Sequence, residues 1–262
     1  MALTPVLYLF LCHLGLGTLF TMVLIGSGAG IRFLRFTSAM AFIFLVLALT
    51  SHPAALTFTR DAEGVACVSL LVTMGALSFV VAPVNPWRLR FLWLSAVAGL
   101  VNLVAQAVAT PTTVPLALTI ASFLTAAALM GSSFTTMLLG HWYLVLPTMD
   151  VTLLQRIVKF HLWSVVAKTV AVAAVAWAAA LAWDPRVAPS FGEYLLSIDG
   201  VFFWQRVLFG LVGPAVLAYM TWETAKIRST QAATGILYVD LFVVIIGELV
   251  AKYVLQATGL PI

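Results

Sequence analysis

Residues 232–257 read AATGILYVDLFVVIIGELVAKYVLQA, and this stretch decides the class of fold. It is apolar over more than the roughly 20 residues that a helix needs to cross the hydrocarbon core of a bilayer. Only three charged side chains, Asp240, Glu248 and Lys252, interrupt it. A helix at the surface of a soluble protein would instead carry polar residues along one whole face. The stretch therefore predicts a membrane-spanning helix.

The composition of the whole chain points the same way. Hydrophobic residues make up 63% of it and charged residues 8%, whereas about a quarter of the residues of a soluble domain are charged. We therefore predict an all-α integral membrane protein in which residues 1–262 form a single transmembrane helical domain. The first apolar run lacks the basic segment that precedes a signal-peptide core, so we expect it to be retained as a helix.

Eight apolar runs are long enough to span a bilayer, which predicts a bundle of eight transmembrane helices. These runs cover about residues 5–31, 36–54, 64–84, 90–109, 113–140, 158–183, 200–222 and 232–257. The longest connections, at about 141–157 and 184–199, leave no room for a soluble domain.

The basic residues predict the orientation of the bundle. They gather in the first, third, fifth and seventh loops, as Arg32, Arg35, Arg88, Arg90, Arg156, Lys159, Lys226 and Arg228. The loops on the other side carry Arg60 and Arg186. Loops rich in Lys and Arg stay in the cytoplasm, so we expect the N-terminus and the C-terminus both to lie outside. Basic residues in short groups between apolar runs do not indicate a nucleic-acid partner.

Glu248 and Lys252 are four residues apart, in the order that favours an ion pair on one helix. An isolated charge at this depth costs at least about 2.5–3.5 kcal/mol, and pairing lowers that cost. Lys252 can also extend toward the membrane surface. We therefore expect a mainly structural pair, in which Glu248→Gln is milder than Lys252→Met and the double variant recovers stability. Lining of a cavity between helices is the alternative.

Other polar side chains also fall in the apolar runs. Asp240 and Lys168 would form an ion pair if their helices meet. Asn102 and Gln106, four residues apart, suit hydrogen bonds between helices. Of the four histidines, His141 and His161 fall near the expected cytoplasmic boundary, as solvated residues would.

The remaining histidines, His13 and His52, fall in the outer half of the expected bundle, near Arg60, Asp61 and Glu63. Oxidation of a quinol needs an apolar slot, a hydrogen-bonding group at the ring oxygen and a base that passes protons to water. Histidine beside a carboxylate suits this task, because its pKa lies close to neutral. His52 and Glu63 are therefore candidate catalytic residues.

The end of the chain resembles a known family. The segments FFWQRVLFGLVGPAVL, residues 202–217, and LFVVIIGELVAKYVLQATG, residues 241–259, are similar to the last two helices of the eight-helix membrane anchors of dimethyl-sulfoxide-reductase-type and polysulfide-reductase-type molybdoenzymes. His52 before Pro53 resembles that family's His near the outer end of helix two. Glu63 resembles the acidic residue that opens helix three, and His13 with Gly17 resembles the polar residue and Gly of helix one.

This resemblance implies a quinone-reactive anchor in a bacterial or archaeal cytoplasmic membrane. Menaquinone or ubiquinone would be bound as substrate near His13, Gly17, His52 and Arg60, with His52 and Glu63 handling protons. The partners would be an iron–sulfur electron-transfer subunit and a catalytic subunit of the kind that carries molybdopterin. The resemblance implies no haem and no metal site of the chain's own.

Three other functions are open from the sequence. A cytochrome b-type anchor would bind haem through His13 with His52 and through His141 with His161. A secondary transporter coupled to protons or ions would use the charged residues of the spans, which are Lys168, Asp240, Glu248 and Lys252. A retinal protein would use Lys252, but no carboxylate lies inside the third run to act as its counter-ion.

Overall fold

The structure is a computed structural model that describes residues 3–146, 149–183 and 188–262; Arg186 lies outside these ranges. Within them every regular element is helical, and eight helices are long and apolar enough to cross a membrane, as the sequence predicts. The elements are α1 (Leu3–Ile25), α2 (Gly30–Ser51), η1 (Pro53–Ala55), α3 (Ala62–Val81), α4 (Arg88–Ala109), α5 (Leu116–Val145), α6 (Val151–Leu181), α7 (Phe191–Leu196), α8 (Gly200–Val207), η2 (Leu208–Val212), α9 (Gly213–Lys226) and α10 (Thr230–Thr258).

Several helix ends differ from those expected from hydropathy. The connection expected at 141–157 is largely helical, because α5 continues to Val145 and α6 already begins at Val151. The Asp150 carboxylate accepts a hydrogen bond from the backbone N–H of Thr152 and caps α6, so a polar stretch starts the helix. The first span ends earlier than expected, at Ile25 rather than near residue 31. Gly26 and Gly30 have positive φ and form the turn between α1 and α2.

The eighth span is the last helix, α10, and the seventh is made of three pieces in line. The segment η2 between α8 and α9 is π-helical, and Gly213 and Pro214 follow it. Proline in a helix interior removes a backbone hydrogen bond and favours such a local change of winding. At η2 the backbone of Gly210 lies against that of Gly247 on α10: a Cβ on Gly247 would overlap the Gly210 backbone, and one on Gly210 would overlap the Arg206 guanidinium.

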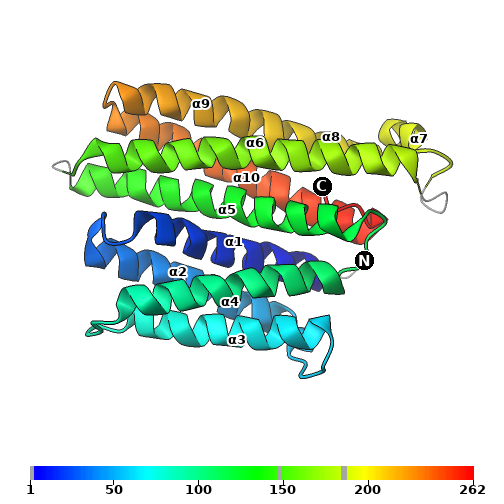
Figure 1. Ribbon diagram of the computed structural model, residues 1–262. Coiled ribbons are helices and arrows are strands. Elements are labelled where there is room, and N and C mark those ends of the chain that lie inside the picture. The colour runs from blue at the N-terminus through cyan, green and yellow to red at the C-terminus, as the bar shows by residue number, and fades with distance from the viewer. Residues whose placement is uncertain (1–2, 147–148, 184–187) are drawn as a thin grey trace.

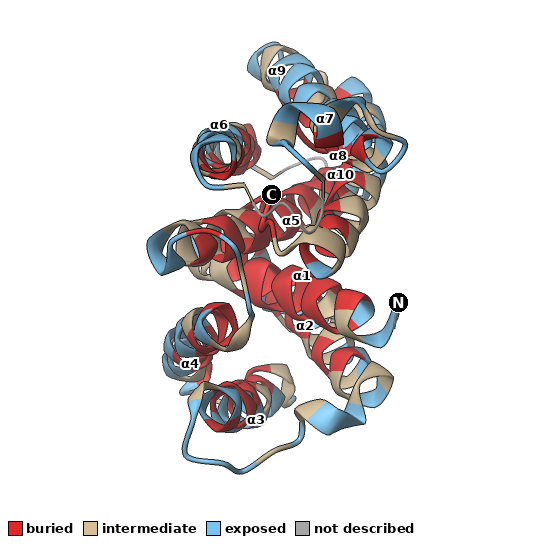
Figure 2. Cartoon of the chain, turned by 90° about the vertical axis from the view of Figure 1, so that its right-hand side faces the viewer, coloured by how far each residue is buried: buried red, intermediate tan, exposed pale blue. Residues whose placement is uncertain are grey.

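The helices form two groups that meet along α1 and α5 (Figures 1 and 2). One group contains α1–α4, and the other contains α5, α6, α10 and the span made of α8, η2 and α9. At the seam the backbones of Gly17 and Gly131 touch, because neither residue has a side chain to separate the helices. α1 lies on the side of the first group that faces the second (Figure 2). It is the most buried of the eight spans in the described part of the chain.

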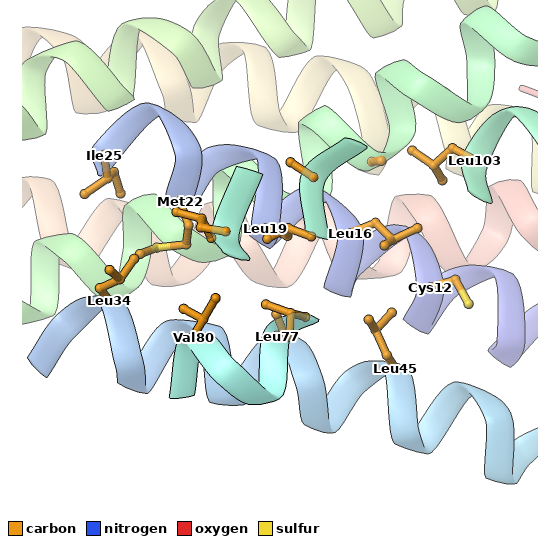
Figure 3. Close-up of a cluster of buried hydrophobic side chains, with 14 of the residues drawn as sticks. Cys12, Leu16, Leu19, Met22, Ile25, Leu34, Leu45, Leu77, Val80 and Leu103 are labelled. Atoms are coloured by element: carbon orange, nitrogen blue, oxygen red, sulfur yellow. The ribbon is translucent and has the colours of Figure 1, made fainter. Parts of the chain in front are cut away.

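The largest apolar core surrounds α1 and extends from the first group to the facing residues of α5 and α6. Cys12, Leu16, Leu19 and Met22 recur at helical spacing along α1 and face Leu45 of α2 among others (Figure 3). All of these side chains are buried, whereas the outward faces of the bundle carry exposed Leu, Val, Ile and Phe residues. In a bilayer those outward residues contact lipid, which explains why an apolar surface surrounds an apolar core.

α1 begins and α10 ends at the same end of the bundle, which we call the N/C end (right in Figure 1, facing the viewer in Figure 2). There the backbone carbonyl of Gly259 accepts a hydrogen bond from the N–H of Thr113. The opposite end, which we call the basic end, holds the eight basic residues of the odd-numbered loops. Several of them bind helix ends there: Arg35 donates to the Val81 carbonyl and Arg156 donates to the Leu24 carbonyl.

Candidate functional site

A cavity of about 330 Å³ opens at the N/C end among the first four helices. It lies at the small end of the range of ligand pockets, roughly 300–1,000 Å³. Its wall comes from α1, the end of α2 with η1, the start of α3, the end of α4 and one residue of α10. The lining residues are Pro5, Tyr8, Leu9, His52, Ala54, Ala55, Thr57, Glu63, Ala66, Gln106, Ala109, Thr110, Pro111 and Gln256.

His52 reaches this cavity because α2 ends immediately before it. Its backbone N–H makes the last bond of the helix, to the Ala48 carbonyl, and Pro53 then opens η1. The helix end predicted from the His52–Pro53 pair is therefore confirmed. The imidazole lies 5.6 Å, centroid to centroid, from the ring of Tyr8 and is only partly buried. It is thus placed between an apolar wall and water.

Glu63 lines the same cavity from the first turn of α3. The neighbouring Asp61 caps that helix by accepting a hydrogen bond from the N–H of Gly64. The Thr59 hydroxyl and this N–H hold the pKa of the Asp61 carboxyl below its usual value, since both hydrogen bonds favour the charged form. Gly64 is needed at this turn, because a Cβ there would overlap the backbone of Thr59.

The floor of the cavity is a buried polar network. Gln106 donates from Nε2 to Asn102 Oδ1 at 2.8 Å and to the Tyr8 hydroxyl at 3.5 Å. Asn102 in turn donates to the Ala66 carbonyl at 2.6 Å, which ties α4 to α3 and confirms the expected hydrogen bond between helices. Among the described residues, Gln106 Oε1 has no hydrogen-bond partner. A buried acceptor left in this way favours a ligand or water that donates to it.

The other residues predicted for the site lie outside the cavity lining. His13 is fully buried behind Tyr8 and Gln106, with its ring in edge contact with Phe123 at 4.8 Å. Neither of its ring nitrogens has a partner among the described residues. Gly17 lies further along α1, at the contact with α5. Arg60 is exposed in the loop before α3. The structure therefore brings His52 and Glu63 together, with His13 behind them.

A cluster of charges lies deeper in the second group of helices. Glu248 lies 2.8 Å from Arg206 and 3.5 Å from Lys252, so the pair expected within α10 is confirmed. The expected extension of Lys252 toward the surface is wrong: its side chain is 3% exposed, and Nζ lies 5.4 Å from the centre of the Phe123 ring. Glu248 keeps Lys252 inside, because its carboxylate lies 3.5 Å from Lys252 Nζ; Arg206 shares the same carboxylate.

Sequence reasoning left Arg206 without a partner. The signal was an arginine inside an apolar run with no carboxylate near it on its own helix, which requires a partner on another helix. Hydropathy predicts how deep in the membrane such a residue lies, but not the direction in which it points around the helix axis. The contact with Glu248 follows from the close approach of the Gly210 and Gly247 backbones, which brings η2 against α10.

The ion pair considered for Asp240 and Lys168 does not form. Lys168 donates to Ser122, to Oγ at 2.8 Å and to the carbonyl at 3.2 Å. Asp240 Oδ2 lies 3.0 Å from His161 Nε2 and accepts a hydrogen bond from Ser133 at 2.6 Å. The expectation that His161 is solvated is also wrong, since it is fully buried. It lies at the end of the third turn of α6, which begins earlier than expected, so it lies well inside the bundle.

The four histidines fit two haems poorly. His161 already holds Asp240 with one ring nitrogen and Ser132 with the other, at 2.8 Å. His141 is exposed near the basic end, where its Nδ1 lies 3.0 Å from the Tyr238 hydroxyl. Among the residues that the structure describes, no group of three or more His, Cys, Asp and Glu side chains could hold a metal ion.

Comparison with protein-family models and with curated proteins gives no match for this chain.

Proposed function

We propose that this chain is the membrane subunit of a respiratory redox complex, in which it exchanges electrons between the quinone pool and an extracytoplasmic iron–sulfur subunit. The observation that carries the proposal is the cavity at the N/C end, where His52 and Glu63 meet beside the apolar side chains of α1. Gln106 supports it as well, because its amide side chain lines the cavity and can hydrogen-bond a ring oxygen.

Three lining residues have a role in this proposal. A bound quinol supplies two electrons and two protons when it is oxidised to the quinone. His52 accepts a hydrogen bond from one ring hydroxyl and takes its proton, because a positioned imidazole can act as a general base. Glu63 takes the proton of the second ring hydroxyl and, because it is exposed, passes both protons to water. Gln106 orients the ring from the floor, and the two electrons leave to the iron–sulfur subunit.

The charge distribution gives the proposal an orientation. The basic end faces the cytoplasm by the positive-inside rule, so the N/C end with its cavity faces outward. The iron–sulfur subunit, and a catalytic subunit of molybdopterin type, would then dock over the N/C end of a protein in a bacterial or archaeal cytoplasmic membrane. Electrons would travel a short way from the cavity, and protons would be released outside.

The test is His52→Ala in the assembled complex, with His141→Ala as the matched control at the basic end. We expect His52→Ala to lower the rate of quinol oxidation by about 100-fold or more, the usual effect of losing a positioned base. His141→Ala should leave the rate unchanged. Both variants should assemble, because neither leaves a buried charge unpaired. Wild-type quinol oxidation by His52→Ala would remove the cavity from the proposal.

A further inference from the structure

The cluster around His161 and Asp240 is used neither by the cavity nor by the charges near Glu248. It lies between α5, α6 and α10, and all four of its polar side chains are buried: Ser132, Ser133, His161 and Asp240. A carboxylate inside a bilayer is costly and marks a site of ion or proton binding by default. The hydrogen bonds within the cluster indicate whether it can bind an ion or a proton.

The tautomer of His161 depends on the Ser132 hydroxyl. When that hydroxyl donates to the Leu129 carbonyl at 3.1 Å, His161 Nδ1 donates in the 2.8 Å contact with Ser132. Nε2 then lies 3.0 Å from Asp240 Oδ2 but in a direction that makes no hydrogen bond, while Ser133 donates to the same oxygen. The pair is neutral when one proton lies on Nε2 or on the carboxylate, so these two atoms are the two places for that proton.

One oxygen of this carboxylate is still open. Asp240 Oδ1 is buried and has no hydrogen-bond partner among the described residues. A buried unpaired carboxylate oxygen is expensive, and a proton or a water molecule relieves that cost. This second observation points to proton exchange, because the surrounding groups are two hydroxyls and an imidazole rather than the several oxygens that a metal cation requires.

Few other ionisable groups face the pair. On α5 and α1 the neighbouring side chains carry no charge, and on α9 Tyr219 is exposed while Glu223 and Lys226 pair with each other. On α10, Tyr238 is exposed on another face and Glu248 lies two turns away, about 12 Å along the axis. On α6, Lys168 lies a similar distance from His161, about 10 Å. The proton of the pair is thus not fixed by a nearby charge.

An apolar layer separates the pair from the charges near Glu248. Val244 lies midway between Asp240 and Glu248 on the same face of α10, and it packs with buried residues of α5 and α6, namely Leu129, Met130 and Val165. Toward the basic end the surroundings are mixed: the buried hydroxyls of Thr136 and Thr234 lie there together with apolar side chains such as Ile157 and Leu237. The bundle therefore has polar groups on each side of a dry layer.

We propose that His161 and Asp240 form a proton-binding site that exchanges with the basic end of the bundle, and that the layer around Val244 is the barrier to proton passage toward the N/C end. This inference does not rest on quinone binding. Two buried sites separated by a removable apolar layer are the parts needed for controlled proton transfer across the membrane.

The proposal is tested by proton flux into liposomes that contain the full chain alone, without quinone or partner subunits. A potassium diffusion potential drives the flux, and a trapped pH-sensitive dye reports it. We expect Val244→Asn to raise the flux about tenfold or more over wild type, because a polar side chain admits water to the layer. Adding Asp240→Asn should return the flux to the wild-type rate.

Two controls separate this effect from general damage. Val244→Leu keeps the layer apolar and should not leak. Leu45→Asn places the same amide in the core of the other helix group, away from the pair, and should not leak either. Equal leakage of Val244→Asn with and without Asp240→Asn would overturn the proposal, and so would a folded Val244→Asn without leakage.

A second measurement applies even if Val244→Asn does not fold. Infrared difference spectra of the wild type between high and low pH should contain a carboxyl band that Asp240→Asn lacks. Glu63→Gln serves as the matched control, because Glu63 is exposed and its loss should leave that band in place. Identical difference spectra for the wild type and Asp240→Asn would refute the proton site.

Discussion

Glu248→Gln should be the most damaging neutral replacement in the charged cluster, although the sequence alone ranks it as the milder one. Glu248 is the only carboxylate among the described residues in contact with Arg206 and Lys252, at 2.8 and 3.5 Å. Removing one partner of a buried ion pair costs about 3–5 kcal/mol, because the other charge stays buried and uncompensated. Here two cations lose their partner at once.

Lys252→Met leaves the pair of Arg206 and Glu248 intact. It removes a charged contact that is already long, at 3.5 Å, so its cost should lie near the lower end of the roughly 1.5–3 kcal/mol typical of hydrogen bonds to charged groups. The double variant with Glu248→Gln and Lys252→Met should not recover, because Arg206 remains unpaired. Recovery should require Arg206→Met as a third change.

Thermal unfolding of the four variants in one detergent measures this order. We expect melting temperatures to fall from wild type to Lys252→Met and then to Glu248→Gln, with the triple variant above Glu248→Gln. A Glu248→Gln protein that melts at or above Lys252→Met would refute the reasoning, since it would mean that the carboxylate does not hold both cations. A double variant as stable as wild type would show that Arg206 needs no partner.

Three further predictions concern packing, pH and topology. Gly17→Ala should cost about 1–3 kcal/mol by forcing α1 from α5, whereas Gly75→Ala, with nothing near its Cβ, should be neutral or stabilise by up to about 1 kcal/mol; equal losses on thermal unfolding would contradict this. Asp61 has a lowered pKa in the folded state, so its contribution to stability is present above the unfolded-state pKa of about 4 and is lost as pH falls through the folded-state pKa. The melting temperature between about pH 3 and 7 should therefore depend less on pH in Asp61→Ala than in the wild type. An unchanged pH dependence would count against the cap. A cysteine at Leu196 should be labelled from outside intact cells by an impermeant maleimide and one at Ile227 should not, both positions being exposed; the reverse labelling would invert the topology.

The sequence predicts the number of helices and their depth, because both follow from the length and polarity of each apolar run. It also predicts contacts within one helix, such as Glu248 with Lys252, since their spacing alone sets them on one face. Contacts between helices are harder to predict from the sequence. Arg206 with Glu248 and His161 with Asp240 depend on how each helix is rotated about its axis, and hydropathy of nearly uniform runs carries little information on rotation.

The cavity was partly predictable for the same reasons. His52 before Pro53 marks a helix end, and Glu63 opens the next helix, so two consecutive ends of one hairpin had to lie close together. Tyr8 and Gln106 come from helices that pack there only in the folded bundle, and no local pattern marks them as lining residues. Gly17 illustrates the reverse case, because a glycine expected near a ligand serves instead to bring two helices together.

The contact of Gly17 with Gly131 determines how the two helix groups communicate. At that seam no side chain can change its rotamer, and a shift of one backbone collides at once with the other. The two helix groups therefore cannot slide along each other at this contact unless the two backbones first move apart. Beside the seam, His13 contacts Phe123 and Phe123 contacts Lys252, so these three side chains link α1 to the charged cluster by small movements of rings and an ammonium group.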